Sequence, residues 1–359
     1  MRKYILRVLD LFSGCGGFSY GFQEAGFNVV LGIDNVDIAL KTFKYNHNNT
    51  HTKNVDLSKI DNLQEIVNFL NEKGGVDVII AGPPCQGFSL TGSRKEDDER
   101  NKLFYSVFEI AKMLNKKPKA IIIENVPGLA TLYKGKAKEE IERNFKENKY
   151  TKQSKILYAP NYGVPQIRKR LFFVGLDEHY GNFKFPDEIL SKDEYITCEK
   201  AISDLPSLEV TMGDENIDYI CEPNSDYQVK MRLNSKKINN HIGTQHTDLV
   251  KSVIAQVPEG GNHKDLPKGV GDSRKFNEAW TRYHSQKPSK TIDTGHRNHF
   301  HYKYNRVPTV RENARFQSFP DNFKFLGTKT QQYRQVGNAV PPLLGFHIAK
   351  QLKKVLDNE

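Results

Sequence analysis

Short apolar runs alternate with segments of helical periodicity over the first half of the chain. Five runs predict strands that are buried on both faces: residues 4–11, 28–33, 76–81, 119–123 and 171–176. Apolar residues at helical spacing lie between them, for example Leu103, Val107 and Ile110. Alternating strands and helices predict an α/β fold with a doubly wound, mostly parallel sheet.

The pattern changes after Pro186. Gly, Pro, Asn and Asp interrupt residues 187–310, which predicts a second, smaller and irregular domain. Helical periodicity returns near Arg311 and continues to the end of the chain. We therefore expect a first domain of residues 1–186 that is completed by residues 311–359, and a second domain of residues 187–310. A length of 359 residues fits two domains.

Composition narrows the class of protein. The sequence has no run of 18 apolar residues and no charged-then-apolar leader, so we expect a cytoplasmic protein that is neither secreted nor membrane-spanning. The four cysteines are widely separated, which favours neither a disulfide framework nor a CxxC metal site. Any reactive cysteine is expected to act alone.

The chain has a formal net charge of +10, and its charged residues are unevenly distributed along the sequence. Residues 187–226 hold 2 basic and 12 acidic side chains, which fits a solvated surface. Residues 227–310 hold 15 basic and 6 acidic side chains, interleaved with aromatic residues and seven of the eleven histidines. Such a mixture supplies phosphate contacts and base contacts, so we expect a nucleic-acid partner.

Polar residues and glycines follow the first predicted strands. The first strand runs into a turn containing Phe12, Gly14, Gly16 and Gly17, and Ser19 stands where a dinucleotide fingerprint needs glycine. Asp34 ends the second strand, where an acid can bind ribose hydroxyls. Asp56 follows and can accept from an exocyclic amine. Together these residues predict a nucleoside site without a phosphate, which suits S-adenosyl-L-methionine; strand–helix packing and helix capping are the alternatives.

Cys85 is expected to be a presented thiol rather than a buried one. It follows Pro83 and Pro84 after an apolar strand, and glycines on both sides of the loop permit a ligand to approach closely. The thiolate form would be nucleophilic. An inert, buried cysteine is the alternative.

Three further charged residues are candidates for chemistry. Glu124 comes directly after three isoleucines, and such a poorly solvated carboxyl favours its protonated, proton-donating form. Strand alternation predicts that Arg168 and Arg170 share one face and point together at an anionic or carbonyl-bearing ligand. Glu124 could instead cap a helix, and Arg168 and Arg170 could instead lie on a solvated edge strand.

The motifs together resemble those of the DNA (cytosine-5) methyltransferase family, in its prokaryotic modification type. In order along the chain they are Asp10 to Gly17, Pro83-Pro84-Cys85-Gln86, Glu124-Asn125-Val126, Gln166-x-Arg168-x-Arg170, Arg311 to Pro320, and Gln335 to Pro341. Residues 187 to about 280 lack a match, and this is where the family keeps its variable target-recognition domain. The family usually has glutamate at the ribose position, where this chain has Asp34.

The resemblance implies methyl transfer from S-adenosyl-L-methionine to C5 of a flipped-out cytosine in double-stranded DNA. It implies that Cys85 adds covalently to C6, that Glu124 contacts N3 and the N4 amine, that Arg170 contacts O2, and that Arg168 supports the catalytic site. The cofactor residues implied are Phe12, Gly14, Gly16, Gly17, Asp34, Asp56, Pro83, Asn338 and Val340. The first domain would then be catalytic and cofactor-binding, and the second would recognise the target.

Other interpretations remain open. A tRNA cytosine-5 methyltransferase would share these motifs, and an inactive DNA-binding protein could keep the scaffold. We expect a monomer without an obligatory protein partner, associated with the nucleoid through DNA, whose partner in a restriction-modification system would be a cognate endonuclease. No metal site is expected, and a zinc site at His296, His299 and His301 is disfavoured because no cysteine lies near them.

Overall fold

The computed structural model describes residues 4–84, 103–270, 279–295 and 298–357. The chain forms two compact units. Unit 1 comprises residues 1–158, 169–187 and 342–359, and unit 2 comprises residues 159–168 and 188–341. Residues 311–341, which the sequence analysis assigns to the first domain, therefore cluster with unit 2, as does the short segment 159–168.

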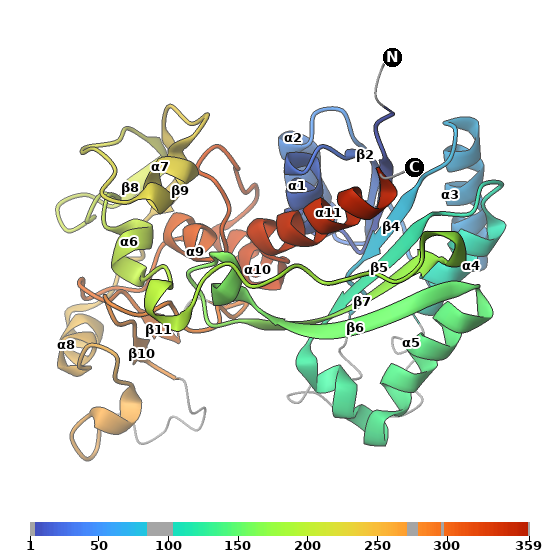
Figure 1. Ribbon diagram of the computed structural model, residues 1–359. Coiled ribbons are helices and arrows are strands. Elements are labelled where there is room, and N and C mark those ends of the chain that lie inside the picture. The colour runs from blue at the N-terminus through green and yellow to red at the C-terminus, as the bar shows by residue number, and fades with distance from the viewer. Residues whose placement is uncertain (1–3, 85–102, 271–278, 296–297, 358–359) are drawn as a thin grey trace. The chain divides into compact units, whose positions relative to one another are not determined.

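Unit 1 contains a seven-stranded sheet within the described residues, in the order β3-β2-β1-β4-β5-β7-β6 (Figure 1). The first five strands of this order are parallel, while β7 is antiparallel to both β5 and β6. This is the predicted doubly wound, mostly parallel sheet. The strands are β1 (Arg7–Leu11), β2 (Asn28–Asp34), β3 (His51–Asn54), β4 (Val78–Ala81), β5 (Ala120–Asn125), β6 (Tyr150–Tyr158) and β7 (Lys169–Asp177).

Helices cover both faces of this sheet. Leu9, Ile79 and Ile121 face one core cluster, together with apolar side chains of α3, α4 and α5. On the other face, the Phe18 ring of α1 lies 6.0 Å from the Phe172 ring of β7. The helices of unit 1 are α1 (Gly17–Glu24), α2 (Asp37–Asn46), α3 (Ile60–Glu72), α4 (Tyr105–Met113), α5 (Lys136–Glu147) and α11 (Pro342–Leu356).

Strand register brings the candidate residues to one edge of the sheet. Leu11 pairs with Ile33 and Ala81, and Ala81 pairs with Ile123, so the carboxyl ends of β1, β2, β4 and β5 are level. Because β7 runs the other way, its first residues lie at the same edge, where Leu171 pairs with Asn125. Ligands of doubly wound sheets bind at this edge.

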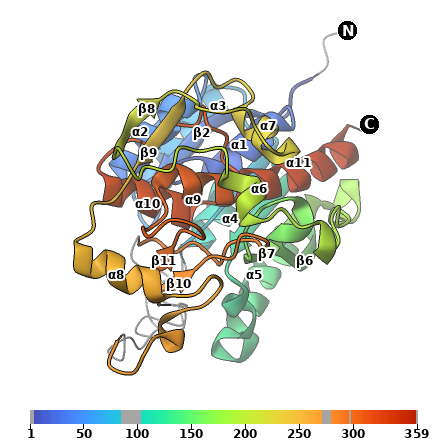
Figure 2. The ribbon, with the colours of Figure 1, turned by 90° about the vertical axis from the view of Figure 1, so that its left-hand side faces the viewer.

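Unit 2 has short elements joined by long loops. The antiparallel strands β8 (Gly213–Ile217) and β9 (Ile238–Ile242) form a two-stranded sheet, and β10 (Thr281–Arg282) pairs with β11 (His299–Phe300) (Figure 2). The helices are α6 (Cys198–Ile202), α7 (Asp226–Arg232), α8 (Asp248–Gln256), α9 (Val310–Phe316) and α10 (Lys329–Asn338).

Unit 2 contains buried ion pairs whose charged groups are matched and hydrogen-bonded. The Arg315 side chain of α9 is fully buried and pairs with Asp204 and Asp321. Arg306 pairs through both terminal nitrogens with the buried Glu312. No helix among the described residues is long and apolar enough to span a membrane.

The last helix packs closely on the first. A β-carbon at Gly21 of α1 would lie 2.4 Å from the carbonyl oxygen of Pro342 and 2.5 Å from the amide nitrogen of Phe346, both in α11. Backbone atoms at such distances cannot move aside without shifting a helix. The absence of a side chain at Gly21 is therefore what lets α11 complete unit 1.

We predict that Gly21→Ala destabilises the protein by about 1–3 kcal/mol, the usual cost of overpacking a core. Chemical denaturation followed by circular dichroism measures this change. Gly128→Ala is the matched control, because a β-carbon there would meet no atom of the described residues within 4 Å, its chain neighbours aside. Equal stability of the two variants would contradict the proposed packing constraint.

Candidate active site

The glycine turn after β1 has an unusual backbone. Phe12, Gly14 and Gly16 have φ angles of 58°, 54° and 93°, in the left-handed region. The amide of Ser13 donates to the carbonyl oxygen of Ile33 in β2 (2.9 Å), which joins the turn to the neighbouring strand. Helix α1 begins directly after this turn at Gly17. The amides of the turn and the helix N-terminus therefore lie at the edge where the strands end.

Asp34 holds this turn in place. Its Oδ2 accepts a hydrogen bond from the Gly14 amide and its Oδ1 accepts one from the Val36 amide, both at 2.8 Å. Burial raises the pKa of the Asp34 carboxyl, and the backbone hydrogen bonds oppose this shift. Since each carboxylate oxygen has a second lone pair, Asp34 retains the capacity to accept from a ligand.

Asp56 lies one strand further along the same edge. It follows β3, in which Asn54 pairs with Asp34. Its exposed carboxylate accepts from the amide (3.0 Å) and hydroxyl (2.8 Å) of Ser58, and these hydrogen bonds lower its pKa. A charged carboxylate at this position can accept from an amino group.

The turn also contains an orphaned polar atom. The Oγ of Ser13 is buried and has no hydrogen-bond partner among the described residues. Buried hydroxyls normally have one. An unpaired hydroxyl beside left-handed glycines and two strand-ending carboxyls fits a site for a polar, nucleoside-bearing group.

Glu124 and Arg170 form an ion pair at the catalytic end of the sheet. The Nε of Arg170 lies 2.8 Å from Oε1 of Glu124, and the two side chains are only 15% and 12% exposed. Their shielding from water makes the pair stronger than a surface ion pair. The apolar strand alone led us to expect a neutral carboxyl; the adjacent guanidinium adds a partner that favours its charged form.

Gly82 lies between the glycine turn and this ion pair. A β-carbon at Gly82 would lie 3.6 Å from Oε2 of Glu124 and 3.9 Å from the carbonyl oxygen of Phe12. The Asn125 side-chain amide donates to the carbonyl oxygen of Pro83 (3.3 Å), which anchors the start of the loop after β4. Cys85 itself lies outside the described residues.

Arg168 and Arg170 contact different groups, contrary to the prediction that they point together. Strand β7 begins only at Lys169, so the alternation of side chains does not extend to Arg168. The buried Arg168 belongs to unit 2, where it donates to the carbonyl oxygens of Gly337 (2.9 Å) and Ala339 (3.1 Å). Arg168 therefore orders the segment that contains Asn338 and Val340.

Gln166 and Gln317 extend this network in unit 2. Gln166 donates to the side-chain oxygen of Gln317 (2.6 Å), and Gln317 donates to the carbonyl oxygens of Val336 (2.9 Å) and Ala339 (3.1 Å). Both glutamines are fully buried. Hydrogen bonds thus hold the backbone around the predicted cofactor residues Asn338 and Val340. Asn338 is exposed and Val340 is buried.

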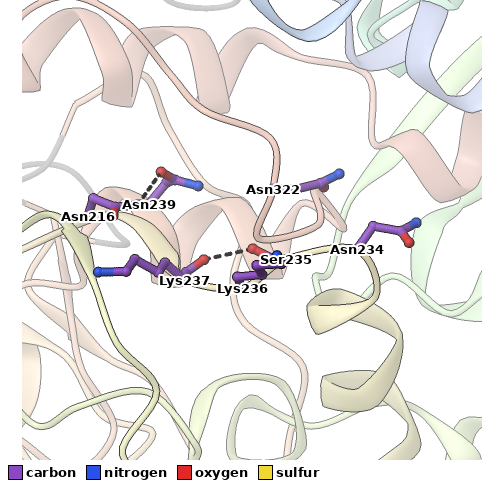
Figure 3. Close-up of a pocket in the computed structure, with 7 residues that line it drawn as sticks. All are labelled: Asn216, Asn234, Ser235, Lys236, Lys237, Asn239 and Asn322. Carbon is purple, nitrogen blue, oxygen red and sulfur yellow. Dashed lines mark hydrogen bonds between the residues drawn. The ribbon is translucent and has the colours of Figure 1, made fainter.

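Two further features of unit 2 are the surroundings of His301, one histidine of the disfavoured zinc site, and a surface depression. Nδ1 of the buried His301 accepts from the amides of Lys303 (3.0 Å) and Tyr304 (3.2 Å), and His296 lies outside the described residues. An open polar depression contains none of the predicted site residues (Figure 3). Its lining residues are Asn216, Asn234, Ser235, Lys236, Lys237, Asn239 and Asn322. Over the described part of the chain, no group of three or more acidic, histidine or cysteine residues could hold a metal ion.

Three residues within the quoted motifs shape the site although no role was predicted for them. Asp10 is buried at the end of β1 and accepts a hydrogen bond from the Ser19 hydroxyl (2.6 Å). Its position beside the glycine turn was a visible signal, because an acid within an apolar strand needs a specific partner. Ser13 and Asn125 lie inside the quoted motifs, but their individual roles depend on contacts with distant segments, which the sequence does not show.

The fold is a mostly parallel α/β sheet, and one edge of it brings together a glycine turn, two strand-ending acids and a shielded acid–guanidinium pair. A model of the C-5 cytosine-specific DNA methylase family matches residues 6–354. The type II methyltransferase M1.HphI of Haemophilus parahaemolyticus is 38% identical, with 100% of this chain and 91% of the relative covered. M.DdeI of Desulfomicrobium norvegicum is 36% identical, with 98% and 90% covered.

Solved structures agree with this result. A prophage-encoded protein of E. coli, described as a DNA modification methyltransferase, matches with a TM-score of 0.80 and 27% identity, over 98% of this chain and 100% of the other. The Dnmt2 methyltransferase of S. pombe shares the fold with a TM-score of 0.62 and 19% identity, over 98% and 99%. The chain belongs to the C-5 cytosine-specific DNA methylase family and is a DNA (cytosine-5) methyltransferase, which confirms the resemblance.

We predict a pH-dependent contribution of Asp10 to stability. Burial raises the pKa of the Asp10 carboxyl from 3.8 to about 8, and repulsion from Asp34 adds to this shift, while the Ser19 hydrogen bond opposes it. The folded protein therefore keeps a proton that the unfolded chain loses above pH 4. The free energy of unfolding decreases as pH rises from about 4 to about 8.

Asp10→Asn removes this proton while keeping an acceptor for Ser19. Between pH 5 and 7.5, the stability of the wild type should fall relative to the variant by at most about 1.4 kcal/mol per pH unit. Urea denaturation across this pH range measures the difference. Parallel pH profiles of the two proteins would show that Asp10 is ionised in the fold.

Proposed function

We propose that this protein methylates C5 of a flipped-out cytosine within a specific sequence of double-stranded DNA, using S-adenosyl-L-methionine, as the modification enzyme of a type II restriction-modification system. The observation that carries the proposal is the edge of the unit 1 sheet. There the glycine turn with Asp34, and the Glu124–Arg170 pair, lie on either side of Gly82. The names of the relatives, both type II methyltransferases, support the biological setting.

The glycine turn and its neighbours are proposed to bind the cofactor, which when bound supplies an electrophilic methyl group. Amides of the turn that contains Phe12, Gly14, Gly16 and Gly17 would contact its polar end. Asp34 would accept from the ribose hydroxyls and Asp56 from the adenine amine. Pro83, Asn338 and Val340 are predicted to complete the binding site. The orphaned hydroxyl of Ser13 supports a polar ligand at this place.

Cys85 is proposed as the nucleophile. Cytosine C5 is too weakly nucleophilic to be methylated unaided, and a bond from the Cys85 thiolate to C6 makes C5 electron-rich, which is covalent catalysis. Once C5 is methylated, a base removes the C5 proton and the thiolate leaves, which restores the aromatic ring. The start of the loop that carries Cys85 is anchored by Asn125 through the carbonyl oxygen of Pro83.

Glu124 and Arg170 are proposed to bind the pyrimidine during this addition. Negative charge develops on N3 when the thiolate adds. Glu124 would accept from the N4 amine, and it must first take up a proton, against the preference set by its Arg170 partner, to donate to N3. Arg170 would contact O2. The pair observed between them keeps the two groups side by side at the distance of one hydrogen bond, so both can meet one edge of the same ring.

Target recognition is assigned to residues 187–310. A cytosine inside a duplex is inaccessible to a thiol, so the base must leave the helix. The basic and aromatic composition of residues 227–310 supports contacts to phosphates and bases. Arg168 is proposed to act indirectly, because its hydrogen bonds hold the backbone on both sides of Asn338.

We predict that expression in a host free of cytosine-5 methylation deposits 5-methylcytosine at one recurrent sequence in the host DNA. Cys85→Ser should lower this methylation by at least about a thousandfold, because the hydroxyl replaces the nucleophile. Bisulfite sequencing measures both activities. Cys221→Ser is the matched control, since Cys221 is an exposed cysteine of unit 2 whose thiol donates to the carbonyl oxygen of Asp204 (3.4 Å).

A duplex that contains 5-fluorocytosine at the target should trap the wild-type enzyme, because fluorine at C5 cannot leave as a proton does. The adduct is seen as a mobility shift that survives denaturation. Full methylation by Cys85→Ser would overturn the covalent mechanism. Methyl transfer to tRNA in place of duplex DNA would overturn the choice of substrate.

We predict that exchanging residues 187–280 for the corresponding segment of M1.HphI changes the methylated sequence to that of the donor. Contacts to bases determine which sequence a protein recognises, and the exchanged segment is proposed to make them. Residues 311–341, Gln166 and Arg168 are the same in the chimera and in the wild type, so the rest of unit 2 keeps its hydrogen bonds. Sequencing of plasmid DNA gives the target, and cofactor affinity reports on the fold of the chimera. A folded chimera that keeps its original target would refute the recognition assignment.

A further inference from the structure

His47 lies beneath the glycine turn. It follows the last residue of α2 and is only 1% exposed, on the core side of the turn. A β-carbon on Gly16 would lie 2.3 Å from Nε2 of His47 and 2.8 Å from the Phe43 ring. The imidazole therefore packs directly against the backbone of the turn, in space that any other residue at position 16 would need.

Two aromatic rings support the turn from below. The rings of His47 and Phe43 lie 4.2 Å apart. Phe43 in turn packs on Gly32 of β2, where a β-carbon would lie 2.6 Å from its ring. The order Gly16, His47, Phe43 and Gly32 thus forms one continuous stack. It sets the spacing between the turn and the strand that ends in Asp34.

A chain of polar contacts, part of it buried, also holds the imidazole. Nδ1 of His47 lies 2.5 Å from Oε1 of Gln23, which belongs to α1. The Gln23 amide donates weakly to the Thr50 hydroxyl (3.5 Å), and that hydroxyl donates to the carbonyl oxygen of Val29 in β2 (2.8 Å). His47 therefore connects α1, which follows the turn, to β2, which ends at Asp34.

The imidazole is neutral under ordinary conditions. Burial lowers the pKa of His47 to about 4, while a backbone hydrogen bond with Gly16 opposes the shift. A neutral imidazole offers one donor and one acceptor nitrogen, which suits contacts on two sides. Phenylalanine could fill the same space, but it would leave Oε1 of the half-buried Gln23 side chain without this partner.

We propose that His47 is a positioning residue for S-adenosyl-L-methionine: it keeps the Gly14–Gly17 turn in its binding conformation without contacting the cofactor. A binding loop that is already ordered loses less entropy on binding than one that must be ordered by the ligand. The inference rests on the proposed function, because it takes the glycine turn to be the cofactor site.

The test uses the full-length protein and S-adenosylhomocysteine as the probe in calorimetric titration. His47→Phe should raise the dissociation constant about tenfold, corresponding to about 1.4 kcal/mol. The KM for the cofactor should rise in parallel, while kcat at saturating cofactor stays within about twofold, because the lost interaction acts on binding alone. His47→Gln, which retains a polar group for Gln23, should recover most of the affinity.

Tyr150→Phe is the matched control in unit 1. It removes a buried hydrogen bond to the carbonyl oxygen of Pro118 (2.8 Å) at a distant strand, β6. It should lower thermal stability and leave the dissociation constant unchanged. Gln23→Leu tests the same polar contact from α1 and should weaken binding even if His47→Phe does not fold.

The outcomes separate the two proposals. If the wild type does not bind S-adenosylhomocysteine, the cofactor assignment fails. If the wild type binds it and His47→Phe or Gln23→Leu binds equally well, only the role of His47 is overturned. The inference is supported if these variants bind S-adenosylhomocysteine more weakly, if His47→Gln recovers part of the affinity, and if Tyr150→Phe binds as tightly as the wild type.

Discussion

The reversed direction of β7 is the constraint on which the candidate catalytic pair depends. Glu124 is near the carboxyl end of β5, whereas Arg170 is near the amino end of β7. These two positions meet only because β7 is antiparallel to β5; a parallel β7 would place Arg170 at the opposite edge of the sheet. The register then brings both side chains to the edge where the glycine turn lies, so a single strand reversal unites the two halves of the site.

Much of this arrangement could be predicted from the sequence, because buried strands have a strong signal. All five predicted runs overlap strands of the sheet. Strands β3 and β6 were missed because they lie at the two edges, and the polar residues of His51–Asn54 and Tyr150–Tyr158 break the apolar pattern. The candidate acids Asp34 and Glu124 were found because each follows a buried strand directly.

Contacts between distant segments could not be predicted in the same way. The ion pair of Glu124 with Arg170 requires the strand direction, which periodicity does not encode. The partners of Arg168 lie about 170 residues further along the chain, at Gly337 and Ala339. Likewise, the His47 ring meets Gly16 because of how α2 ends, and no local motif marks that contact.

The chain passes between the two units at four places: residues 158 to 159, 168 to 169, 187 to 188, and 341 to 342. Neither unit is therefore a contiguous stretch that a single gene fusion could have added. Excision of residues 188–341 would leave Arg168 behind with its buried carbonyl partners removed. With target recognition placed in residues 187–280, as proposed, a change of specificity requires exchange of that loop-rich segment alone, and the four chain crossings between the units stay unchanged.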